Sequence, residues 1–143
     1  MKVLMGIDTS KFSQDVIRAV VSQYRPENTE VLVLHVLEPV SLMAPPEMAQ
    51  GYAPELEEQE KPAHALVEGI AKELREAGFK AYTAVKIGDV GVSILDTAAE
   101  WDADLIVVGS HGRKGIESFL LGSVAESVAR HAKCSVEVVR RRA

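Results

Sequence analysis

The sequence predicts an α/β protein whose parallel strands form one open sheet with helices on both faces. Two apolar runs, 31–37 and 105–108, are continuous rather than alternating, which is typical of strands buried on both sides. Between such runs lie segments in which apolar residues recur every three or four positions, as on one face of a helix. Alternating strands and helices favour a parallel sheet with right-handed crossovers.

Local patterns of apolar residues and chain breakers set the expected elements. Strands are expected at 2–8, 30–37, 79–87, 105–108 and 136–140, and helices at about 11–24, 63–77, 90–101 and 123–132. The polar turn 8–10 supplies capping groups for the first helix. Pro62 lies either in the first turn of the second helix or inside a longer, kinked one. The strand at 79–87 is weaker and more alternating, which favours a place near a sheet edge.

The proline-rich segment 38–54 predicts a long loop between the second strand and the second helix. Loops of this length inside a compact domain are usually functional or mobile. Two interpretations therefore stay open, a lid over a ligand and a surface loop without fixed structure.

The composition is that of an ordinary globular protein and narrows the function. The 143 residues suit a single domain, 1–143, with 47% hydrophobic and 26% charged residues. The formal net charge of −5 argues against nucleic acid or an acidic membrane as the main partner. No apolar run is long enough to cross a bilayer. The single cysteine, Cys134, is expected to be a small buried hydrophobe and fits a cytoplasmic protein.

A glycine-punctuated segment after the fourth expected strand is the main candidate for a ligand site. It contains Gly109 and Gly112, and Gly122 comes directly before Ser123, the expected cap of the next helix. Glycines let the backbone approach a ligand closely, and a helix start offers unpaired N–H groups with partial positive charge. This combination favours phosphate, and Arg113 adds positive charge. The alternative is a loop that only turns a corner before a capped helix.

The spacing of these glycines resembles the ATP-binding signature of the universal stress protein family. Two residues separate Gly109 from Gly112, and nine separate Gly112 from Gly122, which precedes a serine. Residues 3–10 resemble the first strand and acidic turn of that family, and residues 134–140 resemble its last strand. The resemblance therefore covers nearly the whole chain.

The resemblance implies a Rossmann-like domain of the adenine nucleotide alpha hydrolase-like type, with strand order 3-2-1-4-5. It also implies a role in stress responses, binding of ATP with or without Mg²⁺ or Mn²⁺, and a homodimer formed through the last strand, Val136 to Val139. In this arrangement the strand order reverses between strands one and four. The loops after Asp8 and Gly109 are therefore expected to meet there, with main-chain amides around both glycine clusters holding the phosphates.

By resemblance, the nucleotide contacts fall in three regions of the chain. They are Asp8, Thr9 and Ser10 after the first strand, Val36 at the end of the second, and Gly109, His111, Gly112, Gly122, Ser123 and Val124 around the glycine loop. Val36 matches the family position whose main chain meets adenine, whereas its side chain alone indicates only core. Asp8 has three alternative roles, namely a ligand for a phosphate-bound metal, a partner for a ribose hydroxyl, and a cap for the next helix.

Missing motifs argue against several familiar nucleotide enzymes. There is no Gly-x-x-x-x-Gly-Lys-Ser/Thr loop and no Gly-x-Gly-x-x-Gly after the first strand, which disfavours a P-loop ATPase and a dinucleotide dehydrogenase. No acidic partner lies close to His111 in sequence, so general-base catalysis is not indicated. His35 and His131 are expected to be packing or surface residues.

Three hypotheses for the function remain. The first is an ATP-binding regulatory module, with or without slow hydrolysis. In this module the nucleotide sets the conformation of the 38–54 loop and thereby alters a surface for an unknown protein partner. The second is a nucleotide-using enzyme that transfers an adenylyl or phosphoryl group. The third is a nucleotide-free dimerisation module, against which the glycine signature counts.

Overall fold

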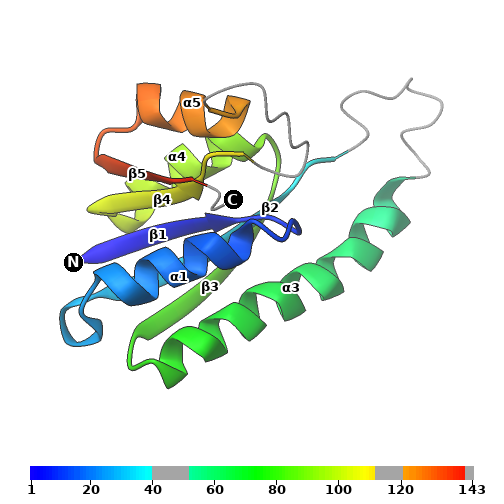
Figure 1. Cartoon of the computed structure of the whole chain (residues 1–143). Helices are drawn as coiled ribbons and strands as arrows, with labels where there is room; N and C mark the ends of the chain where they lie inside the picture. The colour runs from blue at the N-terminus through cyan, green and yellow to red at the C-terminus, as the bar shows by residue number, and fades with distance from the viewer. Residues whose placement is uncertain (40–51, 112–120, 141–143) are drawn as a thin grey trace.

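Strands and helices alternate along the chain in the computed structural model, which describes residues 1–39, 52–111 and 121–140 (Figure 1). The strands are β1 (Lys2–Ile7), β2 (Glu30–Leu37), β3 (Lys80–Ile87), β4 (Leu105–Gly109) and β5 (Ser135–Val139). The helices are α1 (Ser13–Gln23), α3 (Tyr52–Glu76), α4 (Val90–Trp101) and α5 (Ser123–His131), with a 3₁₀ turn, η1 (Pro26–Asn28), before β2. The predicted alternation is therefore confirmed.

The five strands form one parallel sheet in the order β3-β2-β1-β4-β5, which confirms the predicted order. β1 lies at the centre, and β3 and β5 form the two edges. The edge position of β3 agrees with its alternating sequence, because one side of an edge strand needs less apolar cover. The order of the strands reverses between β1 and β4.

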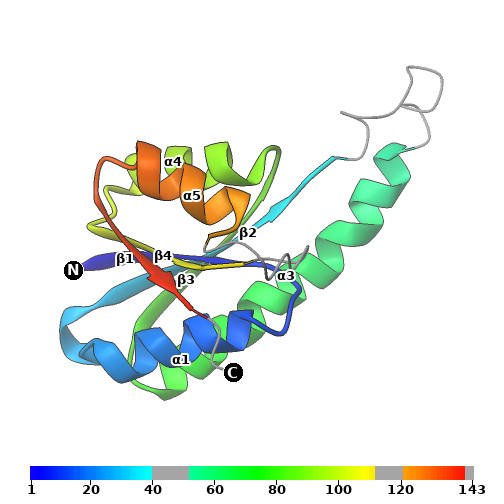
Figure 2. The same ribbon diagram turned by 45° about the horizontal axis from the view of Figure 1, so that its top comes forward.

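Helices cover both faces of this sheet, with α1 and α3 on one face and α4 and α5 on the other (Figure 2). Each face has its own core. Successive residues of the central strands alternate between the two cores, as the pleat of a strand requires. Met5 packs toward α1 and α3, for example, whereas its neighbour Leu4 packs toward α4 and α5. The strands read as continuous apolar runs because both of their faces are buried.

α3 is longer than the expected helix at 63–77, because it begins at Tyr52 and contains Pro62 in its interior. The structure thus agrees with the alternative of a longer helix around Pro62. Residues 52–54, which were expected in the preceding loop, belong to this helix instead. Glutamate, glutamine and lysine, which favour helices, surround Pro62 and extend the helix despite it. The start of α3 extends past the sheet in both ribbon views. Residues 40–51 of the expected loop lie outside the described residues.

α1 begins at Ser13 rather than at about Lys11, and its N-cap position is Phe12, which makes no side-chain capping bond. The expected capping by residues 8–10 is therefore wrong. The carboxylate of Asp8 instead accepts hydrogen bonds from the main-chain N–H and the hydroxyl of Ser10. The carboxylate closes a tight turn two residues long, so the chain enters the helix later.

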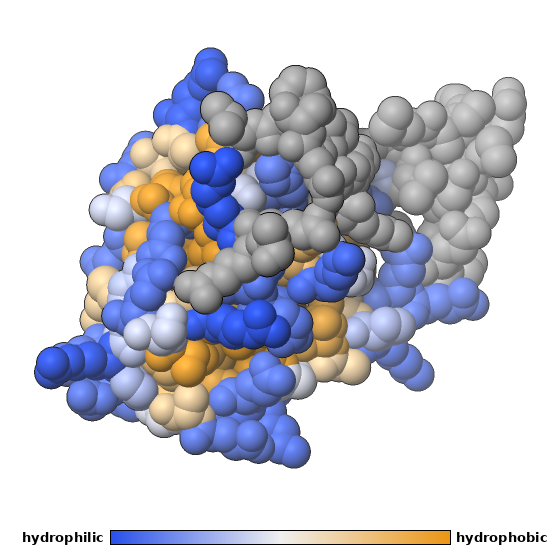
Figure 3. All heavy atoms as spheres, in the orientation of Figure 1, coloured by the Kyte–Doolittle hydropathy of each residue, from blue (hydrophilic) through white to orange (hydrophobic). Residues whose placement is uncertain are grey.

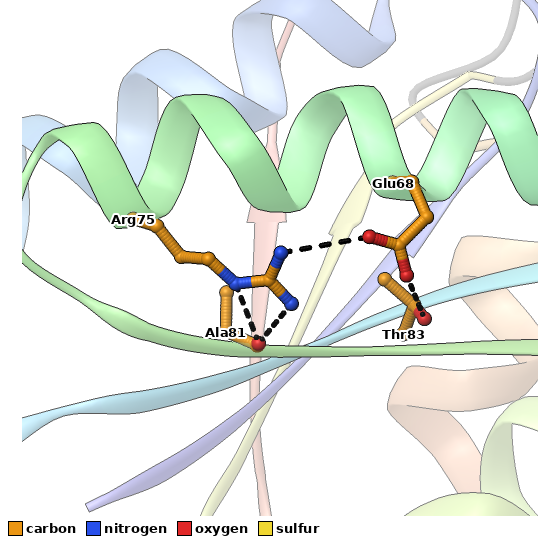
Figure 4. A network of polar contacts seen from close by, with 4 residues as sticks. All are labelled: Glu68, Arg75, Ala81 and Thr83. Carbon is orange, nitrogen blue, oxygen red and sulfur yellow. Dashed lines mark hydrogen bonds and ion pairs between the residues drawn. The ribbon is translucent and has the colours of Figure 1, made fainter.

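A network of polar side chains joins α3 to the edge strand β3 (Figure 4). The Nε and Nη2 atoms of Arg75 donate to the carbonyl oxygen of Ala81, at 3.2 and 2.7 Å. Glu68 lies 3.5 Å from Nη1 of Arg75 and accepts a 2.9 Å hydrogen bond from the hydroxyl of Thr83. The guanidinium thus occupies a main-chain acceptor of an edge strand, where natural proteins commonly place charge.

The opposite edge strand, β5, is tied to the end of α1 through Glu137. The hydroxyl of Tyr24 donates to Oε1 of Glu137. The pKa of Tyr24 is raised from 10.0 to about 12, mainly by burial and then by the hydrogen bond to Glu137 and the charge of that carboxylate. The remaining residues of β5 are only half-buried, apart from the exposed Ser135.

Cys134, just before β5, is half-buried rather than buried, and packs against the core on the α4 and α5 side. Burial is the main cause that raises the pKa of its thiol, which favours the unreactive form. Among the described parts of the chain, no helix is both long and apolar enough to cross a membrane.

Candidate functional site

The candidate site lies at the carboxyl ends of the strands, where β1 and β4 part. The ladder between β1 and β2 continues to the pair Ile7–His35, and the ladder between β4 and β5 continues to Gly109–Val139. The ladder between β1 and β4 ends earlier, at Met5–Val107. A parallel sheet opens in this way at its switch point, where ligands of such folds commonly bind. The strand order therefore brings the chain segments after β1 and β4 to neighbouring positions, as predicted.

Asp8, the first residue after β1, has one carboxylate oxygen used inside the protein. Its Oδ1 accepts from the main-chain N–H of Ser10 at 2.8 Å and from the hydroxyl of Ser10, and the hydroxyl of Ser13 lies 3.3 Å away. Among the described residues, none donates a hydrogen bond to Oδ2. Asp8 is half-buried and Thr9 is exposed, so this carboxylate can be reached from the end of the sheet.

Ser13 holds the main chain of Asp8 as well as its side chain. The N–H of Asp8 donates to the hydroxyl oxygen of Ser13 at 3.1 Å, and this hydroxyl lies 2.9 Å from the carbonyl oxygen of Asp8. Ser13 is buried, with 7% of its surface exposed. The position of Asp8 is therefore fixed by the first residue of α1.

Val36 follows the last residue of β2 that pairs with β1, so it lies beside Asp8 at the end of the sheet. Its side chain is buried in the core on the α4 and α5 side. The structure therefore agrees with the expectation that its side chain serves packing, and leaves its main chain as the group that could meet a ligand.

Ser110 links the end of β4 to the start of α5. Its N–H donates to the carbonyl oxygen of Val139 at 2.7 Å, and its carbonyl oxygen accepts from the N–H of Gly122 at 2.6 Å. The two ends of the glycine loop are thus joined directly above β4. The N–H of Gly122 is used in this bond, which corrects the expectation that amides around both glycine clusters are free for phosphate.

α5 begins at Ser123, with Gly122 at the N-cap position and no side-chain capping bond. The expectation that Ser123 caps the helix is therefore wrong. Gly122 is extended, with φ −71° and ψ 165°, so the helix starts one residue after it. Ser123 is exposed, and Val124 packs its side chain against the core. The first N–H groups of α5 have no partner within their own helix, and no side chain caps the helix start.

Gly109, the last residue of β4, does not adopt a positive φ. A Cβ atom there would lie 3.4 Å from the carbonyl oxygen of His111 and 3.6 Å from Val16, both ordinary contacts. The fold therefore does not require glycine at this position. His111 is half-buried, and its Nδ1 lies 3.3 Å from the hydroxyl of Ser110.

Two of the predicted contacts, Gly112 and Arg113, lie outside the described residues. Sequence reasoning missed three residues that shape the site, namely Ser13, His35 and Ser110. The signal for His35 is a single polar residue near the end of the apolar run 31–37. Ser13 and Ser110 carry no such signal, because they act through main-chain atoms of residues that only the folded chain brings close.

Asp8 can take part in a metal site only together with other ligands. The described residues contain no cluster of three or more His, Cys, Asp or Glu side chains able to hold an ion. Mg²⁺ is usually bound by one or two carboxylates together with substrate phosphates and water. The single oxygen Oδ2 of Asp8 fits that kind of shared site.

The chain is a Rossmann-like α/β protein, because it has this sheet order, helices on both faces and a helix that begins at the switch point. The chain matches the Universal stress protein family over residues 1–140 and belongs to that family. Universal stress protein Sll1388 of Synechocystis sp. is 33% identical over 150 residues, which cover 97% of each chain.

Solved structures of similar proteins share the whole architecture. MJ0577 of Methanocaldococcus jannaschii superposes with a TM-score of 0.88 at 28% identity, covering 99% of this chain and 96% of the other. A universal stress protein solved in complex with cAMP superposes with a TM-score of 0.70 at 25% identity, covering 98% and 96%. The fold is therefore that of the family.

Proposed function

We propose that this protein is a single-domain, cytoplasmic stress-response module that binds an adenine nucleotide, with ATP as the expected ligand. The observation that carries the proposal is the hydrogen bond between Gly122 and Ser110, which seats the start of α5 on the end of β4. A helix N-terminus in that position attracts phosphate through its N–H groups and its partial positive charge. The cAMP complex of a similar protein and the resemblance of the glycine spacing to an ATP-binding signature support the same ligand class.

The described residues suggest how the ligand lies across the switch point. The N–H groups of Ser123 and Val124 face the phosphates, together with the segment that contains Gly112 and Arg113. Oδ2 of Asp8 meets a ribose hydroxyl or a phosphate-bound Mg²⁺ or Mn²⁺ ion, and the main chain of Val36 meets adenine. The positions of Asp8, Val36 and the start of α5 near the carboxyl ends of the strands support this arrangement.

The bound nucleotide acts as a regulatory signal rather than as a substrate that is turned over rapidly. No sequence motif provides a dedicated base to activate water for hydrolysis, so any ATP hydrolysis is slow. The ligand shifts the equilibrium between two states of the chain that offer different surfaces to a protein partner. The size of this shift is limited by the difference in the ligand's affinity for the two states.

Association into a homodimer through β5 belongs to the same proposal. Val139 turns its carbonyl oxygen toward Ser110 on the β4 side. Main-chain groups of successive residues alternate between the two edges of a strand, so Val138 turns its N–H to the open edge. The side of the molecule that carries β5 also shows apolar side chains at its surface (Figure 3).

The nucleotide proposal is tested by denaturing purified protein, identifying any released nucleotide by mass, and then measuring ATP, AMP and cAMP binding by calorimetry. We expect Gly122→Val to abolish binding and to leave the urea unfolding midpoint close to that of the wild type, because the branched side chain would fill the space at the start of α5. Gly69→Ala is the matched control, since a Cβ at Gly69 meets nothing within 4 Å and lies in α3.

The outcomes separate the three hypotheses. Absence of binding to folded wild-type protein would overturn the proposal, and a stable dimer in that case would favour the nucleotide-free dimerisation module. Rapid turnover that needs a second substrate and is lost in Gly122→Val would favour the transferase.

A further inference from the structure

His35 is a buried histidine directed at the end of β1. It lies near the end of β2, is paired with Ile7 in the sheet, and has only 6% of its surface exposed. Its Nδ1 lies 3.0 Å from the carbonyl oxygen of Ile7. A carbonyl oxygen only accepts, so Nδ1 carries the hydrogen and donates it. The imidazole therefore fixes the carbonyl of the residue that precedes Asp8.

Ser13 holds the other polar atom of the same peptide group. The peptide between Ile7 and Asp8 has its carbonyl oxygen bound by His35 and its N–H bound by the hydroxyl of Ser13, at 3.0 and 3.1 Å. A peptide group held at both polar atoms cannot rotate about its two flanking bonds without breaking one of these hydrogen bonds. The direction in which the Asp8 side chain leaves the backbone is thereby set by β2 and α1.

We propose that His35 is a positioning residue of the nucleotide site, which together with Ser13 clamps the Ile7–Asp8 peptide and directs the Asp8 carboxylate to the ligand. The inference rests on the proposed function, because it takes Asp8 as a ligand contact. Oδ1 of Asp8 is already bound by Ser10, so the clamp presents Oδ2 in one fixed direction. A contact ordered before binding costs less entropy when the ligand arrives.

Packing alone does not account for a histidine at this position. Its neighbours Val33 and Ile7 belong to the apolar core on the α1 and α3 side, where an aliphatic side chain would bury without any polar cost. A buried imidazole must instead recover its lost hydration through a hydrogen bond. In this chain the hydrogen bond goes to the peptide that sets Asp8.

The test compares two substitutions that differ in one donor. His35→Asn keeps an N–H close to the position of Nδ1, whereas His35→Leu fills the space without a donor. Calorimetry with ATP should show that His35→Leu weakens affinity about five- to tenfold, and that His35→Asn stays within about threefold of the wild type. His131→Leu is the matched control, because its Nδ1 also lies 2.9 Å from a main-chain oxygen, that of Ser127, but at the exposed far end of α5.

Two further measurements keep the test decisive. Ser13→Ala removes the second half of the clamp and should weaken ATP binding in the same range as His35→Leu, so it replaces that variant if the leucine protein does not fold. In the ligand-free protein, the amide NMR signals of Asp8 and Ser10 should move in His35→Leu and stay near their wild-type positions in His35→Asn.

The failures of the two proposals are distinguishable. If wild-type protein binds no adenine nucleotide, the proposed function falls, and the NMR comparison still decides whether the clamp sets Asp8. If the wild type binds ATP and the folded His35→Leu variant binds it equally well, only the positioning role falls. Equal losses in the leucine and asparagine variants would also overturn it, because they would show that shape rather than the donor matters.

Discussion

The direction of the Asp8 side chain depends on Ser13 and His35, which hold the two polar atoms of the peptide before it. The position of Asp8 after the first apolar run, together with the strand order that the family resemblance implies, predicted a residue at the switch point. The hydrogen bonds that orient it were not predictable, because Ser13 and His35 act on main-chain atoms that give no sequence pattern. The same reason explains why the amide of Gly122 was expected to be free, although it binds Ser110.

Two glycines at the carboxyl ends of neighbouring strands should respond differently to alanine. A Cβ at Gly6 would lie 3.2 Å from both Ile94 and Val108, so Gly6→Ala should cost about 1–3 kcal/mol of stability by overpacking. Gly109→Ala makes only ordinary contacts and should leave stability nearly unchanged while weakening ATP binding. Urea unfolding and calorimetry measure the two effects. Unchanged ATP binding by Gly109→Ala would contradict the assignment of Gly109 to the ligand.

Tyr24 should make stability fall at alkaline pH. Its pKa is about 12 in the folded protein and near the ordinary 10.0 when unfolded, so between these values the folded chain keeps a proton that the unfolded chain has lost. Its contribution to stability is therefore complete below about pH 10 and is lost as the pH rises toward about 12. Tyr24→Phe should show a smaller alkaline loss, measured by urea unfolding at stepped pH. An unchanged slope would contradict the raised pKa of Tyr24 in the folded protein.

At the scale of elements, an apolar stripe was enough to predict each helix. The bounds of a helix were predicted less well where they depend on hydrogen bonds at its ends. α4 has the predicted bounds, because Asp89 caps it through the N–H of Val92 and a capping residue before an apolar stripe is visible in the sequence. α3 begins earlier than expected, since Pro62 is tolerated inside it. The start of α1 was expected about two residues too early, because the expected cap binds elsewhere. α5 begins at Ser123 as predicted, although Ser123 does not cap it.

α3 offers a direct way to raise stability without touching the site. Gly69 lies in the helix interior, and a Cβ there meets nothing within 4 Å. Gly69→Ala should add about 0.5–1 kcal/mol, because alanine loses less backbone entropy than glycine when a helix forms. Thermal and urea unfolding measure the gain. A loss of stability would indicate that the exposed face of α3 is not open as described.

At the scale of the whole molecule, the sheet order and its layers agree with what the family resemblance implied. The physical basis lies in the continuous apolar strands, which need helices on both faces and hence right-handed crossovers. The site is less completely predictable. Its strand-end positions follow from topology, whereas the use of each amide and carboxylate oxygen depends on contacts between distant residues such as Ser110 and Val139.

The proposed dimer can be tested at one main-chain atom. Val138→Pro removes the N–H that faces the open edge of β5 and leaves the ladder to β4 intact, so it should yield folded monomers. Val138→Thr keeps both the N–H and a β-branched side chain, and should remain dimeric. Analytical ultracentrifugation measures the mass in solution, and circular dichroism checks folding. A folded Val138→Pro variant that is still dimeric would place the interface elsewhere.

The guanidinium of Arg75 on the carbonyl oxygen of Ala81 has a consequence for the size of any assembly. If two copies join at β5 about a twofold axis, each outer rim of the combined sheet is a β3 strand with α3 beside it. A third copy would have to displace the Arg75 side chain to continue the hydrogen-bonded ribbon. In the proposed dimer, growth by strand addition would therefore end at a closed pair rather than continue into a polymer.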